Sequence, residues 1–237
     1  MKLAQYLAKK KKPSPQPPRR VQCSRCLQPK SWCYCADIDP FDCSICFVIL
    51  LHPLERRRRI ATGRMSHLLL KNSQMIQGYK YSGDEKVNAL IRDPKYHCMV
   101  LCIGDKAIHI DRLSLEEKKE ICPEGKRLLV FVVDGTWSTA SKTIRLSDNL
   151  KDLPRICFSP DKPSNFRVRQ QPNERCYSTI EAIHQTIELL GPSQGFNIQT
   201  RRHDRLLSVF DGFVTKQVNL MRRLKEQNGL QRRKIRR

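Results

Sequence analysis

Residues 128–137 read LLVFVVDGTW, an apolar run that ends abruptly at Asp134, Gly135, Thr136 and Trp137. The run is rich in Leu and Val and has no polar alternation, which is typical of a strand buried on both faces of a parallel sheet. Open α/β sheets bind their ligands at the carboxyl ends of the strands. A carboxylate there, followed by a permissive glycine and a Trp that can stack, indicates a reaction centre. The alternative is that Asp134 caps the next helix and Trp137 packs in the core.

The segments around this run alternate between strand-like and helix-like patterns. This alternation favours an α/β fold with a mostly parallel sheet flanked by helices. Apolar runs predict strands at 46–52, 97–104, 128–134 and 155–160, and helical spacing predicts helices at 55–72, at 113–120, from 138 onward and at 203–227.

A further helix start is marked at Ser178-Thr179-Ile180-Glu181. The Ser-x-x-Glu spacing is that of a capping box, in which each side chain satisfies a backbone N–H of the first turn. An apolar stripe continues from there, and Gly191-Pro192 ends the helix.

The chain is strongly basic. It has 237 residues, with 45 Lys and Arg against 23 Asp and Glu, a net charge of +22 and a hydrophobic share of 39%. We therefore expect a folded protein with a polyanionic partner. Nucleic acid is the leading candidate and an anionic membrane the alternative, because cations placed on phosphates release condensed counterions. No stretch approaches the ~20 apolar residues of a transmembrane helix, and the N-terminus does not read as a secretory signal.

The sequence contains eleven cysteines, an odd number. Several lie inside apolar strand-like runs, namely Cys46, Cys98, Cys102 and Cys157. A secreted disulfide framework would look different. We expect a reducing, cytoplasmic environment with buried thiols and some metal-binding thiolates.

Four of these cysteines cluster near the N-terminus as Cys23-x2-Cys26-x6-Cys33-x-Cys35. A Cys-x2-Cys pair turns its sulfurs toward one point, and a second close pair completes a tetrahedral four-thiolate zinc site. Because such a set leaves no open position for water, we assign the Zn²⁺ a structural role. Free thiols and an iron–sulfur cluster are the alternatives. A further Cys-x2-Cys pair at 43–46 enters a strand and is better explained by the core.

Five motifs in this order resemble the DTW-domain family of tRNA-uridine aminocarboxypropyltransferases. They span residues 23–182, most of the chain. They are the four-cysteine segment, Leu51-His52-Pro53-x-Glu55-Arg56, Asp134-Gly135-Thr136-Trp137, Arg167-x-Arg169-x-x-Pro172 and Ser178-Thr179-Ile180-Glu181-Ala182.

The resemblance implies a SPOUT-like α/β fold with a C-terminal knot, although knots are rare in general. It also implies S-adenosylmethionine as the donor, held by loops near the knot. Together with the composition it suggests four parts. They are a flexible basic arm at 1–20, a zinc-binding element at 21–44, a catalytic DTW domain at 45–227 and a basic tail at 228–237.

The implied reaction moves the 3-amino-3-carboxypropyl group of S-adenosylmethionine to N3 of a tRNA uridine and releases methylthioadenosine. It needs a proton acceptor for N3, a donor arm aimed at the acceptor, and a uridine splayed from its stack. We expect Asp134 to accept the proton or to fix the donor's amino group, and Trp137 to pack on adenine or on the flipped base. Donor-binding residues are expected at the glycine-containing turn and at the helix start, namely Gly135, Thr136, Ser178, Thr179, Ile180 and Glu181. Glu181 is equally compatible with a purely capping role.

The RNA is expected to contact arginines. Arg56, Arg57 and Arg59 belong to a run of four, whose alternative role is a solvated helix face, and Arg167 and Arg169 lie beside an aromatic residue in a loop, as suits phosphate contact and base stacking. His52 follows a predicted strand, where a plain hydrogen-bonded histidine is the alternative to a functional one. Two other functions remain open: a methyltransferase acting on RNA with the same donor, and a non-catalytic, zinc-containing RNA-binding module.

Overall fold

The computed structural model describes residues 21–53, 55, 60–104, 106–168 and 176–235. The chain forms two compact units, residues 1–36 and 37–237. The described part of the smaller unit holds the cysteine cluster and a 3-10 turn, η1 (Lys30–Trp32). A second turn, η2 (Cys35–Asp37), contains the sequence boundary between the units. The four-part domain division expected from the sequence stays a prediction.

The larger unit is built on a six-stranded sheet with the order β2-β1-β5-β3-β6-β4, in which every neighbouring pair is parallel. The strands are β1 (Cys46–Leu51), β2 (Ser73–Gln77), β3 (Tyr96–Leu101), β4 (Ile108–His109), β5 (Arg127–Asp134) and β6 (Arg155–Cys157). The last residues of β1 and β5, Leu51 and Asp134, are register partners. The predicted α/β class with a mostly parallel sheet is therefore confirmed. The knot stays a prediction, because residues 169–175 between β6 and the next helix lie outside the described residues.

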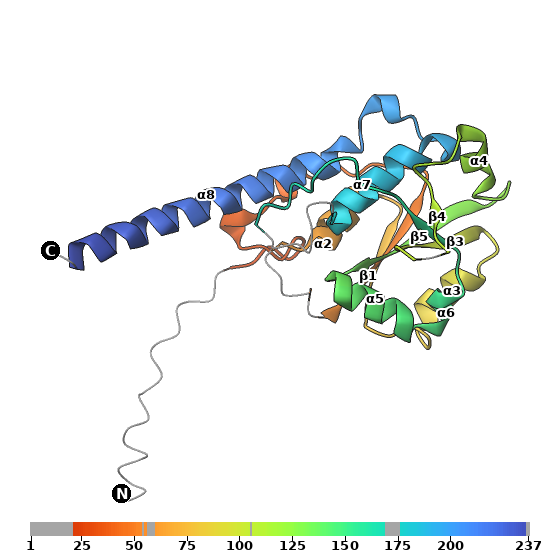
Figure 1. The fold of residues 1–237 in the computed structure, drawn as a ribbon, viewed down its shortest axis with the longest axis horizontal. Helices are drawn as coiled ribbons and strands as arrows, with labels where there is room; N and C mark the ends of the chain where they lie inside the picture. Colours follow the sequence, from red (N-terminus) through yellow and green to blue (C-terminus); the bar gives the residue numbers. More distant parts are fainter. Residues whose placement is uncertain (1–20, 54, 56–59, 105, 169–175, 236–237) are drawn as a thin grey trace, which may run out of the picture. The chain divides into compact units, whose positions relative to one another are not determined.

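Helices cover both faces of the sheet (Figure 1). On one face α3 (Glu85–Arg92), α5 (Trp137–Leu146) and α6 (Asp148–Lys151) pack against alternate residues of β1, β3 and β5. The other face carries α2 (Thr62–Leu69), α7 (Thr179–Leu190) and α8 (Asp204–Ile235), which contact one another. The short helix α4 (Leu115–Glu120) and the turns η4 (Pro192–Gln194) and η5 (Ile198–Thr200) complete the described elements.

The central strand β5 explains why its sequence lacks polar alternation. Leu129 and Phe131 belong to the core cluster under α3 and α5, and the intervening Leu128 and Val130 are equally buried on the opposite face. Both faces are covered, so every position must be apolar. Truncating Phe131 to Ala would cost about 3–5 kcal/mol of stability, as for other buried aromatic side chains.

The predicted strands are all present, but the strands at 97–104 and 155–160 end early, at Leu101 and Cys157. The helix expected at 55–72 begins only at Thr62. The last helix extends beyond its expected end at 227, and its outer apolar residues Met221 and Leu224 are exposed rather than part of one buried face. The edge strands β2 and β4 were missed because one is mostly polar and the other has two residues.

All eleven cysteines lie in the described part of the chain and are free thiols. Of those expected in the core, Cys46, Cys98 and Cys157 are buried and Cys102 is partly exposed. No helix among the described residues is long and apolar enough to cross a membrane.

Candidate functional site

The carboxylate of Asp134 stands at the carboxyl end of β5, where its side chain is only 5% exposed. Its Oδ1 accepts a hydrogen bond of 2.5 Å from the Thr179 hydroxyl and a longer contact of 3.4 Å from the Thr62 hydroxyl. Thr62 and Thr179 are the first residues of α2 and α7. Asp134 therefore joins the N-terminal ends of two helices, which favour a negative charge through their free N–H groups and dipoles.

The approach of α2 to this carboxylate depends on Gly63. A Cβ atom at Gly63 would lie 2.6 Å from Asp134 Oδ2 and 2.9 Å from Ile49 Cγ2. Such distances are shorter than van der Waals contact, so any side chain there would push α2 away from the sheet. The glycine thus fixes how closely the helix start meets Asp134.

The turn after Asp134 is shaped by its own hydrogen bonds. Thr136 is the N-cap of α5, and its hydroxyl accepts a hydrogen bond of 3.1 Å from the Thr139 N–H. A Cβ at Gly135 would lie 2.6 Å from Thr139 Oγ1, so a side chain there would displace the Thr139 hydroxyl from its hydrogen bonds with Thr136. The alternative in which Asp134 caps this helix is wrong, because Thr136 takes that role. Trp137 is the first residue of α5, and its side chain lies outside the described part of the structure.

A cleft of about 1160 Å³ opens beside this turn, at the carboxyl ends of β3, β5 and β6. This is where ligands bind in open parallel sheets. Among the predicted donor-binding residues, the structure brings Gly135, Thr136, Ser178 and Thr179 into the cleft wall.

Ile180 and Glu181 instead point into the protein, with exposures of 0% and 7%. The predicted capping box at Ser178 and Glu181 is present. The Glu181 carboxylate accepts the Ser178 N–H at 2.8 Å, and also the Ser164 hydroxyl at 2.8 Å and the Asn165 N–H at 2.7 Å. Glu181 therefore does more than cap α7, because it ties the 164–166 loop to the helix start that lines the cleft.

Three cations in the cleft wall were missed by the sequence analysis. Arg145, Lys151 and Arg155 line it, and none of its described lining residues is acidic. The remaining wall includes apolar and aromatic side chains such as Val132, Phe158 and Tyr177. The cleft therefore suits a ligand that combines an apolar or aromatic body with a negatively charged group.

The four N-terminal cysteines are also brought together, within the smaller unit. All four sulfur atoms lie within 4.8 Å of one another, and the Cys23–Cys35 and Cys26–Cys33 pairs are each 3.7 Å apart. A tetrahedral site with Zn–S bonds of ~2.3 Å needs sulfurs roughly 3.8 Å apart. The geometry and the soft thiolate donors thus fit a metal ion.

The turn at the first cysteine pair is arranged for a thiolate. The backbone N–H groups of Cys26 and Arg25 lower the pKa of Cys23 to about 6. Burial acts in the opposite direction on Cys35 and raises its pKa to about 12. Leu27 adopts the left-handed conformation with φ of 59°, and its N–H donates to the Cys23 carbonyl at 2.9 Å, which closes the turn. A metal ion would replace the protons of all four thiols.

A model of the DTW domain matches residues 20–218 of the chain. The chain belongs to the DTW-domain family. Among curated relatives, proteins named tRNA-uridine aminocarboxypropyltransferase 2 are 26% identical over 177 residues in Mus musculus, 24% over 178 residues in Macaca fascicularis and 29% over 178 residues in Drosophila melanogaster. Each alignment covers 73% of this chain, but only 57% of the mouse and macaque proteins and 68% of the fly protein. No solved structure matches the chain.

The histidine motif of this DTW domain lies next to Asp134. The His52 N–H donates to the Asp134 carbonyl at 3.1 Å, and the Glu55 N–H donates to the His52 carbonyl at 2.8 Å. Glu55 is buried, with 5% exposure. His52 and Glu55 are therefore joined in a tight turn at the end of β1, with Glu55 buried.

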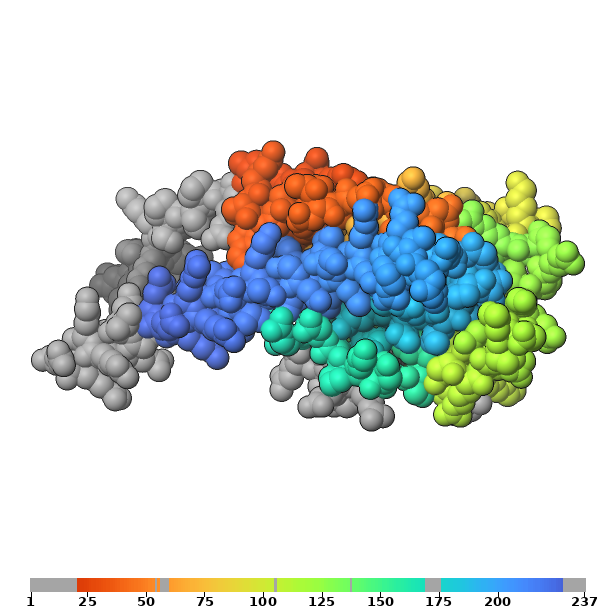
Figure 2. All heavy atoms as spheres, turned by 90° about the horizontal axis from the view of Figure 1, so that it is seen from above, coloured from red at the N-terminus to blue at the C-terminus, as the bar shows by residue number. Residues whose placement is uncertain are grey.

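Of the predicted RNA-contacting residues, Arg167 is exposed, and its guanidinium donates to the Thr215 hydroxyl of α8 at 3.4 Å. Figure 2 shows the loop of residues 158–167, which follows β6, beside α8 on one face of the DTW domain. Arg56, Arg57, Arg59 and Arg169 lie outside the described residues. Further exposed cations follow along α8, namely Lys216, Arg222, Arg223 and Lys225.

Proposed function

We propose that this DTW-domain protein transfers the 3-amino-3-carboxypropyl group of S-adenosylmethionine to N3 of a tRNA uridine, forming acp3U and releasing methylthioadenosine. The family membership supports this, as do relatives named tRNA-uridine aminocarboxypropyltransferase 2. The chain spans little more than half the length of the mouse and macaque relatives, so the activity is transferred from them as a proposal. The observation that carries it is the basic-walled cleft lined by Gly135 and Thr136, the two residues that directly follow Asp134.

The donor is proposed to occupy this cleft. Its adenine would lie against the apolar wall around Phe158 and Tyr177, and Trp137 is proposed to stack on adenine or on the flipped base. Its carboxylate would meet Arg155 or the start of α7 at Thr179, because a cation or a helix N-terminus stabilises an anion. Gly135 and Thr136 would offer backbone contacts, Ser178 a cleft-facing one, and Ile180 and Glu181 would act indirectly by holding the helix start in place.

Chemically, uridine N3 attacks the Cγ of the donor, the Cγ–S bond breaks, and the sulfonium leaves as a neutral thioether. The N3 proton must leave, and Asp134 is proposed either to accept it or to fix the donor's amino group. Its strong hydrogen bond from Thr179 supports the second role, because a carboxylate held by donors at two helix starts is a weaker base. In-line placement of the two reactants can then supply several kcal/mol.

The tRNA is proposed to bind through its phosphates to Arg167 and the exposed cations of α8, together with Arg56, Arg57, Arg59 and Arg169. The four N-terminal cysteines are proposed to hold a structural Zn²⁺. Their free thiols suit a reducing compartment, and we propose that the protein is cytoplasmic.

The test is an incubation of the full chain with labelled S-adenosylmethionine and total tRNA, followed by mass analysis of nucleosides and of the small-molecule product. Methylthioadenosine with aminocarboxypropyl-uridine supports the proposal. Adenosylhomocysteine with a methylated nucleoside would identify an RNA methyltransferase instead. Neither product, with tRNA binding retained, would leave a non-catalytic binding module.

A further inference from the structure

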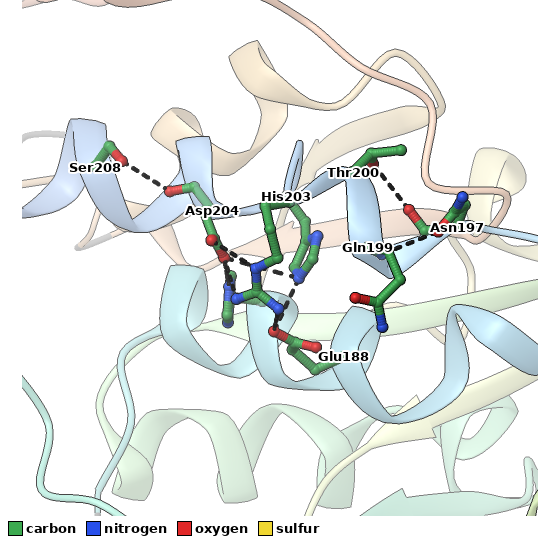
Figure 3. A network of polar contacts seen from close by, with 9 residues as sticks. Glu188, Asn197, Gln199, Thr200, His203, Asp204 and Ser208 are labelled. Atoms are coloured by element: carbon green, nitrogen blue, oxygen red, sulfur yellow. Dashed lines mark hydrogen bonds and ion pairs between the residues drawn. The ribbon is translucent and has the colours of Figure 1, made fainter.

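A second group of metal-type side chains lies at the other end of α7 and is not part of the cleft. It consists of His184 and Glu188 on α7, and of His203 and Asp204 at the start of α8. We call these four residues the His–carboxylate cluster. Figure 3 shows Glu188, His203 and Asp204 pointing toward one another.

The cluster is placed by ordered local structure. His184 and Glu188 are four residues apart on one helix and so share a face. On the other side, Asn197 caps the η5 turn through a 3.0 Å hydrogen bond from the Gln199 N–H, and Arg201 ends the turn in the left-handed conformation with φ of 52°. This turn places His203, the residue before α8, and Asp204, the first residue of α8, against His184 and Glu188 of α7.

His203 gives an independent sign that this cluster can bind a ligand. Its side chain is 0% exposed, and neither ring nitrogen has a hydrogen-bond partner among the described residues. His203 Nε2 lies 3.0 Å from Glu188 Oε1, but this contact does not meet hydrogen-bond geometry. A buried imidazole normally satisfies at least one nitrogen, because leaving a buried polar atom unsatisfied costs about 1–3 kcal/mol.

The ligand atoms have the spacing of a first coordination sphere. His184 Nε2 and Asp204 Oδ1 are 2.9 Å apart, and His203 Nε2 lies 3.0 Å from Glu188 Oε1 and 3.8 Å from Asp204 Oδ1. One ligand atom from each residue lies within 4.8 Å of all the others. Tetrahedral Zn²⁺ with bonds of ~2.0–2.1 Å requires atoms roughly 3.3 Å apart. Small side-chain rotations would therefore close all four ligands on one ion.

We propose that the His–carboxylate cluster is a second metal site, which binds a divalent transition-metal ion of the Zn²⁺ type. Two imidazoles and two carboxylates are borderline and hard donors that suit Zn²⁺. Four protein ligands fill a tetrahedral sphere, so the site is structural rather than catalytic. The ion would fasten α7 to the start of α8. Its ligand His184 lies on α7 five residues after Thr179, the residue that bonds Asp134.

The protonation states of the ligands agree with this role. Burial lowers the pKa of His184, which keeps its imidazole neutral. Glu188 and Asp204 keep a lowered pKa although burial opposes it, because the His203 ring lies close to Glu188, His184 bonds Asp204 and Arg201 pairs with both carboxylates. A neutral His184 imidazole and ionised Glu188 and Asp204 carboxylates are the forms that bind a metal.

Arg201 is the competitor for these carboxylates. Its guanidinium contacts Glu188 Oε1 at 2.5 Å and Asp204 Oδ1 at 2.7 Å, and its side chain is 52% exposed. It can therefore swing into solvent when a metal binds. The alternative explanation is a metal-free clamp in which the Arg201 charge stabilises both acids. The two explanations make opposite predictions for removal of Arg201.

The experiment uses the full chain, stripped of metal and reloaded with limiting Zn²⁺, with zinc counted by elemental analysis and its ligands identified by X-ray absorption. We expect two zinc ions per chain, one with sulfur at ~2.3 Å and one with nitrogen and oxygen at ~2.0–2.1 Å. Glu188→Gln should lose the nitrogen–oxygen ion and keep the sulfur-bound one, which also reports that the variant is folded. The matched control Glu226→Gln, on the exposed part of α8, should retain both.

Arg201→Gln separates the two explanations. If the cluster binds metal, this variant should take up the nitrogen–oxygen zinc about tenfold more tightly, because two competing ion pairs are gone. If the cluster is a metal-free clamp, Arg201→Gln should lower thermal stability and bind no second zinc. A wild-type protein with only sulfur-bound zinc, or a second zinc that persists in Glu188→Gln, would overturn the proposal.

Discussion

Replacing Thr179 with Val removes the shortest hydrogen bond to Asp134 while keeping the shape of the side chain. The lost bond is 2.5 Å long, part-buried and made to a carboxylate. Hydrogen bonds to charged groups contribute about 1.5–3 kcal/mol. If this bond holds Asp134 in its working position, kcat/KM should fall roughly ten- to hundredfold.

The neighbouring threonines provide matched controls. Thr62→Val removes only a 3.4 Å contact, so the loss should be no more than about threefold. Thr186→Val is the same substitution on the same helix, but among the described residues its hydroxyl bonds the Ala182 carbonyl alone, at 2.8 Å, so transfer should stay close to wild type. Initial rates of transfer to tRNA, with melting temperatures for each variant, provide the assay. Equal losses at Thr179 and Thr186, or wild-type activity in Thr179→Val, would refute the reasoning.

Three further predictions concern metal, thiol reactivity and RNA. The purified protein should carry about one sulfur-bound zinc per chain, lost in Cys23→Ser or Cys33→Ser, whereas iron with a visible absorption band would contradict the zinc assignment. In metal-free protein Cys23, whose pKa is lowered to about 6, should be alkylated rapidly above that pH, because the thiolate is the reactive form. Cys35, with a pKa of about 12, should react slowly, and mass mapping that shows equal rates at pH 7 would contradict this order. Affinity for tRNA should fall steeply with salt in filter binding, and replacing Arg57 and Arg59, or removing residues 1–20, should lower the slope by roughly one unit per lost phosphate contact without changing the modified uridine. A flat salt dependence, or modification redirected to another uridine, would argue against this division of labour.

Local patterns in the sequence predicted the local parts of the structure correctly. β5 and the start of α7 are examples, because an uninterrupted apolar run and a Ser-x-x-Glu capping box depend only on neighbouring residues. The sequence analysis did not predict edge strands such as β2, because a polar strand at the edge of a sheet carries no apolar pattern.

The assembly of the site required the tertiary fold. Asp134 was singled out by its place after a strand, but its partners Thr62 and Thr179 are 72 and 45 residues away. No spacing rule connects positions so distant. No spacing rule predicts the cleft cations Arg145 and Arg155 either. They line one cleft because β5, β6 and α5 come together at the same end of the sheet. The partners of the buried His203 are likewise set by the packing of α7 against α8.

The most direct test of the account compares wild type with Asp134→Asn, a variant that keeps the side-chain shape and removes the charge. Both proteins are incubated with labelled S-adenosylmethionine and tRNA, and methylthioadenosine, modified uridine and tRNA affinity are measured together. The account predicts methylthioadenosine and aminocarboxypropyl-uridine in equal amounts from wild type, and loss of both from Asp134→Asn with tRNA affinity nearly unchanged. Transfer by Asp134→Asn within about twofold of wild type would contradict it.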